Sequence, residues 1–150
     1  MRYPVTDHGV EPDKKEQQTE ALQKIFDRCK DGGGTVVFPK GTYRFSGVLI
    51  YSDTTVLLES GAELLGSKEC GEYPVFPVPE GVSLRTDMEM IPNYSGFKIR
   101  GEYRRAMFSA YGERNIAVIG APGSVIDGQI CYDPEGEEGY RGPHGIFLSN

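Results

Sequence analysis

The chain has 150 residues, of which 38% are hydrophobic and 25% are charged, as is ordinary for one folded domain. This composition excludes disorder throughout, and the net charge of −6 argues against a nucleic-acid partner, because phosphate binding needs clustered Lys and Arg. The chain has twenty glycines, most of them spread singly between short apolar runs, which indicates many tight turns and therefore many short strands.

The first residues contain no apolar segment typical of an export signal, and no stretch is long enough to cross a bilayer. The cysteines Cys29, Cys70 and Cys131 are widely spaced and odd in number, so a full disulfide framework is impossible. Neither they nor the isolated His8 and His144 have the spacing of metal ligands. We therefore expect a reduced, cytoplasmic protein without a membrane partner, a metal or a cofactor.

An amphipathic helix is predicted at about 19–30, and the run Gly32-Gly33-Gly34 ends it. A single helix ahead of a strand-rich chain needs an apolar surface to cover, so we interpret it as a cap over one end of a core. Four apolar positions share one face of this helix: Leu22, Ile25, Phe26 and Cys29.

Short β-rich runs follow in quick succession over about 35–66, each bounded by a turn signal. Most runs do not alternate in polarity, which is typical of strands buried on more than one side. An antiparallel meander would show period-2 polarity and two-residue Asn-Gly or Asp-Gly turns. Stacked coils, in which each strand pairs with its counterpart one turn later, are therefore favoured.

Residues at about 67–105 interrupt this rhythm with four prolines, several aromatic residues and little periodicity. We expect a long loop excursion there, either functional or a covering flap packed by its own aromatic side chains. Strand-like runs resume over about 106–150, at 106–110, 115–119, 124–126 and 145–148. The sequence thus predicts an all-β solenoid with an N-terminal capping α-helix.

Four segments of the chain match a known family, and they do so in the same order as in that family. They are TEALQKIFDRC with GGGTVVFPKGTY, GVLIYSDTTVLLESGAELLGS, ERNIAVIGAPGSVIDGQ and RGPHGIFLSN. Together they resemble the polygalacturonase-like pectinases, glycoside hydrolase family 28, of the pectin-lyase-like β-helix superfamily. The resemblance covers nearly the whole chain apart from parts of 67–105. It implies that residues 1–150 are the N-terminal portion of a single right-handed parallel β-helix domain, truncated at its C-terminal end. Such a solenoid exposes an uncapped last coil, so we expect the isolated chain to self-associate.

The resemblance also implies inverting hydrolysis of glycosidic bonds between uronic acid units. One carboxylic acid then protonates the leaving oxygen and one carboxylate activates water. The family carries these groups in Asn-Thr-Asp and Asp-Asp runs, supported by Gly-His-Gly and Arg-Ile-Lys, and none of the four runs occurs in this chain. We assign no catalytic residue and expect the chain to be inactive alone. An acidic cluster is interpreted as a solvated loop: Asp133, Glu135, Glu137 and Glu138.

Tyr140, Arg141 and His144 are the candidate substrate-binding residues, because an Arg beside an aromatic residue can meet a uronate and its sugar ring. The alternative is an Arg that satisfies backbone carbonyls. The expected partner is an acidic, pectin-type polysaccharide. Two other functions stay open on the same fold. One is a non-catalytic polysaccharide-binding or structural, tail-spike-like β-helix, and the other is the N-terminal part of a pectate lyase-like or epimerase-like protein.

Overall fold

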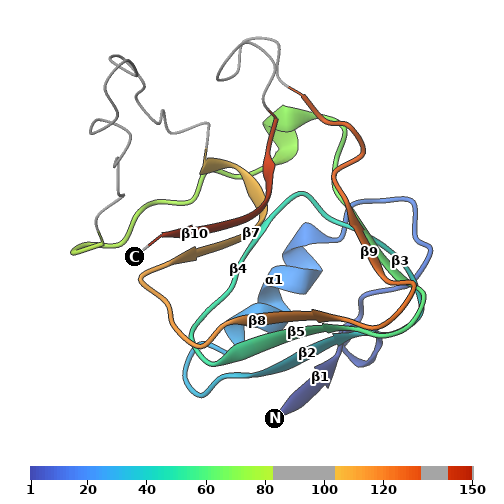
Figure 1. The fold of residues 1–150 in the computed structure, drawn as a ribbon, viewed down its shortest axis with the longest axis horizontal. Helices are drawn as coiled ribbons and strands as arrows, with labels where there is room; N and C mark the ends of the chain where they lie inside the picture. Colours follow the sequence, from blue (N-terminus) through green and yellow to red (C-terminus); the bar gives the residue numbers. More distant parts are fainter. Residues whose placement is uncertain (83–103, 133–141, 150) are drawn as a thin grey trace.

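The computed structural model describes residues 1–82, 104–132 and 142–149. In these residues, three all-parallel sheets surround one core, so that each turn of the chain contributes one strand to each sheet (Figure 1). The strands of the first coil are β2 (Gly34–Phe38), β3 (Gly41–Arg44) and β4 (Val48–Leu49). Those of the second are β5 (Thr54–Leu58), β6 (Ala62–Leu65) and β7 (Ala106–Tyr111). Those of the third are β8 (Ala117–Gly120), β9 (Val125–Asp127) and β10 (His144–Ser149).

The sheet orders are β1-β2-β5-β8, β3-β6-β9 and β10-β7-β4, where β1 is Arg2–Pro4. Val36 pairs with Val56, and Val56 pairs with Val118, so the same core position repeats from coil to coil. This register confirms that the short apolar runs wind into stacked parallel coils. Burial nevertheless alternates along β5, where Thr54, Val56 and Leu58 are buried and Thr55 and Leu57 are half-buried, so one face of that strand meets the core.

One corner of the solenoid is built by residues in the left-handed conformation, stacked directly above one another. Gly33, Asp53 and Asn115 precede β2, β5 and β8, and their φ angles are 65°, 60° and 53°. Asn and Asp are the side chains that best tolerate this conformation. The Asn115 amide donates a hydrogen bond to the Asp53 carboxylate at 2.8 Å, which ties the second and third coils together at the turn.

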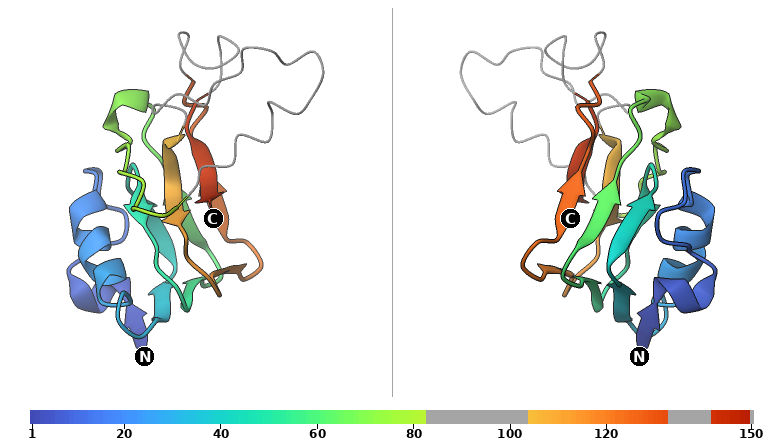
Figure 2. Two further views of the ribbon diagram at one scale, coloured as in Figure 1. Left: turned by 90° about the vertical axis from the view of Figure 1, so that its left-hand side faces the viewer. Right: turned by 90° about the vertical axis from the view of Figure 1, so that its right-hand side faces the viewer.

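The helix α1 (Thr19–Asp27) lies across the end of the first coil, at the opposite end of the stack from β8–β10 (Figure 2). Its regular part ends at Asp27, earlier than the predicted Lys30, because the chain turns from Arg28 onward toward Gly33. Cys29 nevertheless stays buried with the helix face. The core joins this face to the strands through an edge-on contact of Phe26 with Phe108, whose ring centroids lie 6.1 Å apart.

The outer edges of the first coil meet the segment that precedes it. The strand β1 pairs with β2, and the backbone N–H groups of Asp13 and Gln18 donate to Thr42 and Arg44 of β3, each at 2.8 Å. On β4, the side-chain amide of Gln23 accepts from the N–H of Leu49 at 2.8 Å and donates to its C=O at 3.2 Å. Each of the three strands thus has a partner on the side away from the second coil.

The third coil presents apolar side chains at core-facing positions. Ile126 stands above Leu64, Ile146 above Phe108 and Leu148 above Ala110, and each lower residue is buried. The upper three are 36%, 43% and 61% exposed because no further coil covers them here. Among the described residues, no helix has the length and apolar character needed to span a membrane.

Candidate functional site

Two insertions leave the solenoid at the same corner, between the sheet of β6 and β9 and the sheet of β7 and β10 (Figure 1). Twenty residues separate Val36 from Val56, whereas 62 separate Val56 from Val118, and the difference lies between β6 and β7. The second insertion lies between β9 and β10. A regular scaffold that carries long connections at one corner is a common way to place functional residues.

The first residues of the two insertions are bonded to each other. The N–H of Gly66, just after β6, donates to the C=O of Asp127 at 2.8 Å, and the side-chain amide of Gln129 donates back to the C=O of Gly66. The Asp127 carboxylate accepts from the Gln129 N–H at 2.7 Å, which fixes the turn after β9. A side chain at Gly66 would meet the Tyr73 hydroxyl, so the glycine leaves room for this buried phenol.

A cavity of about 300 Å³ opens beside these turns. Tyr73 and Met107 contribute buried walls, and Ile126 lines it from β9. The Tyr73 hydroxyl donates to the C=O of Ser67 at 3.1 Å. Burial is the main cause that raises the pKa of Tyr73 to about 12, and the nearby Cys131 is the second. This phenol is therefore a neutral donor at physiological pH.

His144, the first residue of β10, lines the same cavity. Its backbone N–H donates to the C=O of Arg105 at 2.8 Å, and its ring centroid lies 5.8 Å from that of Phe147. The other two candidate binding residues, Tyr140 and Arg141, lie outside the described residues. The structure therefore places one member of the predicted set in a cavity wall.

The cavity offers an imidazole, a phenol and a thiol, but no pair of carboxylates lines it within the described residues. The nearby Asp127 carboxylate is bonded to Gln129, and Glu72 accepts from the Ser67 hydroxyl at 2.5 Å. The acidic cluster that begins at Asp133 lies outside the described residues. No group of three or more His, Cys, Asp or Glu side chains suited to a metal ion occurs in the part of the chain that the structure describes. This arrangement can bind a polar ligand but does not itself supply acid and base for hydrolysis.

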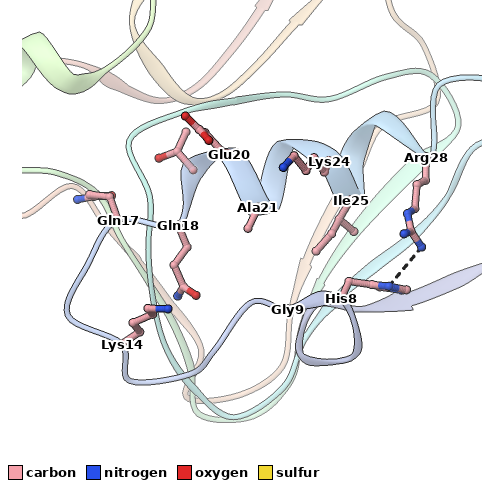
Figure 3. Close-up of a pocket in the computed structure, with 11 residues that line it drawn as sticks. His8, Gly9, Lys14, Gln17, Gln18, Glu20, Ala21, Lys24, Ile25 and Arg28 are labelled. Atoms are coloured by element: carbon pink, nitrogen blue, oxygen red, sulfur yellow. Dashed lines mark hydrogen bonds between the residues drawn. The ribbon is translucent and has the colours of Figure 1, made fainter.

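A larger cavity, of about 620 Å³, lies between α1 and the segment before it (Figure 3). Several of its polar groups already have partners within the chain. Lys14 donates to the Glu11 carboxylate at 2.8 Å, which raises the pKa of Lys14, and Arg28 lies 3.2 Å from Nδ1 of His8. The side-chain amide of Gln18 is bonded to the backbone of Glu11 through both its oxygen and its nitrogen. Because these polar groups are already engaged, we place the candidate site at the insertion corner instead.

Cys70 and Cys131 lie together, with their sulfur atoms 2.9 Å apart, although the sequence analysis did not predict this pairing. Cys70 follows the end of β6 by five residues, and Cys131 follows the end of β9 by four. The signal is therefore positional: the two residues occupy nearly the same place in consecutive coils. This correspondence between the two cysteines can be recognised only once the strand register is known.

Comparisons with known proteins agree with this architecture. A family model described as rhamnogalacturonase A/epimerase, pectate lyase-like, matches residues 3–69. Alginate lyase 7 of Azotobacter vinelandii is 40% identical over 68 residues, which are 45% of this chain and 8% of that protein. The exo-poly-alpha-D-galacturonosidase of Dickeya chrysanthemi is 36% identical over 70 residues, 47% of this chain and 12% of that protein.

Among solved structures, the family 28 exopolygalacturonase of Yersinia enterocolitica superposes with a TM-score of 0.60 and 30% identity. That match covers 85% of this chain and 21% of the exopolygalacturonase. The fold is therefore a right-handed parallel β-helix, like that of the proteins on which it superposes. Within that class, the matches to the exo-poly-alpha-D-galacturonosidase and to the family 28 exopolygalacturonase agree with the resemblance found in the sequence. It spans at most 12% of the two sequence relatives.

Proposed function

We propose that this chain forms the first coils of a pectin-degrading glycoside hydrolase, a polygalacturonase-like enzyme that cleaves bonds between uronic acid units with inversion. The observation that carries the proposal is the match to a family 28 exopolygalacturonase at 30% identity over 85% of the chain. The 36% identity to an exo-poly-alpha-D-galacturonosidase supports the same substrate class. The partner in this proposal is an acidic, pectin-type polysaccharide.

The first contribution of these residues to such an enzyme is a closed end. Buried backbone groups need hydrogen-bond partners, and an open sheet edge invites pairing with another chain. The partners described above for β2, β3 and β4 serve this purpose, and the apolar face of α1 covers the core beneath them. We therefore assign α1 and the segment before it the role of an N-terminal cap.

The second contribution is the corner from which both insertions leave. His144 in its cavity, with Tyr140 and Arg141 preceding it in the sequence, forms the proposed contact with the uronate. A guanidinium fork pairs with a carboxylate, and an aromatic ring packs on a sugar face. The acid and base that hydrolysis requires come from residues beyond this sequence, since the runs that carry them in the family are absent from it.

The test is an assay for new reducing ends on polygalacturonate. The 150-residue chain alone is expected to release none, whereas the product of the extended reading frame, if it carries the acid pair, is expected to hydrolyse the polymer. Turnover by the 150-residue chain that is abolished by Asp133→Asn or Glu135→Gln would contradict the proposal. An extended protein that carries the acid pair, is folded and is inactive on uronans would contradict it as well.

A second candidate is a lyase or epimerase acting on a uronan, and the 40% identity to an alginate lyase favours it over other chemistries. The same preparation distinguishes the two. A lyase creates an unsaturated sugar that absorbs ultraviolet light, and an epimerase changes the sugar composition without cutting the chain. A hydrolase yields saturated products with reducing ends.

We further propose that the isolated chain self-associates through its third coil. Ile126, Ile146 and Leu148 occupy core positions and are exposed there, and apolar surface of this kind favours association. Size-exclusion chromatography with light scattering is expected to show oligomers whose fraction grows with concentration. Leu148→Lys is expected to shift the chain toward monomer, because it places a charge in the contact. Val75→Lys is the control, since Val75 is also exposed, at 39%, but lies outside the third coil, so its replacement should leave the association unchanged.

A further inference from the structure

The roots of the two insertions carry one cysteine each, and the structure brings these cysteines together. The Sγ atoms of Cys70 and Cys131 are 2.9 Å apart although 61 residues separate them in sequence. Two unbonded sulfur atoms normally stay at about the sum of their van der Waals radii, well beyond this distance. A disulfide needs only a further closing of the gap to about 2.05 Å.

The coil register explains why the pair is held in place. The two cysteines follow β6 and β9, and neighbouring parallel strands such as these lie about 4.8 Å apart, within the usual Cα–Cα range for a disulfide of about 4.4–6.8 Å. The Gly66–Asp127 and Gln129–Gly66 hydrogen bonds lock the two turns in that register. Cys70 opens the short helix η2 (Cys70–Glu72), whose position is fixed by Ser67, since the Ser67 hydroxyl accepts from the Glu69 N–H at 3.0 Å.

Within the described residues, the cysteine pair lacks the further ligands of a metal site. A structural zinc needs about four ligands, and no cluster of three His, Cys, Asp or Glu side chains exists among the residues described here. Both thiols are also partly accessible, unlike that of Cys29, which is fully buried. We propose that Cys70 and Cys131 form an intramolecular disulfide that links the roots of the two insertions.

The bond forms by exchange with a small disulfide such as oxidised glutathione. One cysteine thiolate attacks a sulfur of the small disulfide, which gives a mixed disulfide and releases one small thiol. The second cysteine thiolate then attacks the protein sulfur of that mixed disulfide and releases the other small thiol. The two protein thiols lose two protons and two electrons, and the small disulfide gains them as two thiols.

The consequence is a rigid wall for the cavity at the insertion corner. Cys131 lines this cavity beside Tyr73, and the cross-link fastens that wall to the segment after β6. The link also closes a long loop of the chain, and such closures stabilise most through the unfolded state. This inference does not rest on the proposed hydrolase activity, because it concerns the state of two sulfurs.

The test equilibrates the folded chain with reduced and oxidised glutathione, quenches with acid, alkylates the remaining thiols and digests without reduction. Mass spectrometry is expected to find one cross-linked peptide pair containing Cys70 and Cys131, lighter by two hydrogens than the separate peptides. Burial raises the pKa of the Cys29 thiol, so Cys29 is expected to be alkylated only after unfolding.

Thermal melting provides a second measurement. Reduction is expected to lower the Tm of the unmodified chain by roughly 10 °C, while Cys70→Ser and Cys131→Ser should melt at one temperature in both redox states. The proposal would be overturned if Cys70 and Cys131 were both found alkylated, or both found carrying glutathione, in a chain whose circular dichroism is native. A link that involves Cys29, or a Tm of the unmodified chain that does not respond to reduction, would overturn it too.

Discussion

Replacement of Phe108 by Ala is expected to lower the free energy of unfolding by about 3–5 kcal/mol. Phe108 is completely buried in β7, and its ring lies 6.1 Å from that of Phe26 in α1 and 5.4 Å from that of Phe45 in the first coil. One side chain therefore joins the helix, the first coil and the second coil. Its removal leaves a cavity that three separate segments would have to close.

Urea denaturation followed by circular dichroism measures this loss, with the slope m as a check that the unfolded state is unchanged. Tyr132→Ala is the control, because Tyr132 is also aromatic but 57% exposed, and its truncation should cost no more than about 0.5 kcal/mol. Equal losses in the two variants would mean that the core does not run through Phe108. Leu148→Lys can be combined with both to keep the chain monomeric during the measurement.

Much of the fold could be predicted because solenoid coils are built from short-range signals. The runs around Val36, Val56 and Val118 carry β-branched residues bounded by turn residues, and those turn residues adopt left-handed conformations in the structure. Parallel stacking followed from the lack of alternation in these runs. The helix face was also readable, since Leu22 and Phe26 are fully buried.

Pairings across the insertions could not be predicted, because nothing local encodes them. Val48 of β4 pairs with Phe108 of β7, and the long excursion lies between them in sequence. A register across such a gap is set by the stacking of the flanking coils and by core packing. The contact of Cys70 with Cys131 depends on that register, so the sequence alone led us to expect only separate, reduced thiols.

The candidate site was harder to predict than the fold. The sequence singled out His144 for its place near an Arg and a Tyr, and the structure puts it in a cavity wall with Met107 and Tyr73. Met107 and Tyr73 carry no motif, and they reach the cavity only because β7 and the segment after β6 meet at the insertion corner. A site assembled from two consecutive coils depends on the strand register, and the spacing of its residues along the sequence does not reveal it.

The glycine run after α1 is another feature whose role could not be predicted residue by residue from the sequence. The pattern Gly32-Gly33-Gly34 predicts a chain reversal but does not distinguish the three positions. In the structure, Gly33 has a φ of 65°, and a Cβ atom there would lie 2.4 Å from the carbonyl oxygen of Asp53. That oxygen accepts from the Gly34 N–H at 3.1 Å, so it cannot move away without loss of a bond between the first and second coils.

Gly33→Ala is therefore expected to lower the free energy of unfolding by at least about 2 kcal/mol, through the left-handed backbone and the contact together. Gly32→Ala is the matched neighbour, because a Cβ there meets nothing within 4 Å and its φ is ordinary, and the change should stay within about 0.5 kcal/mol. Gly123→Ala separates the two causes: its φ is 80° but its Cβ would be in open space, so it should show the backbone cost alone. If the three variants unfold at the same urea concentration, the close packing of Gly33 against Asp53 does not stabilise the stacked coils.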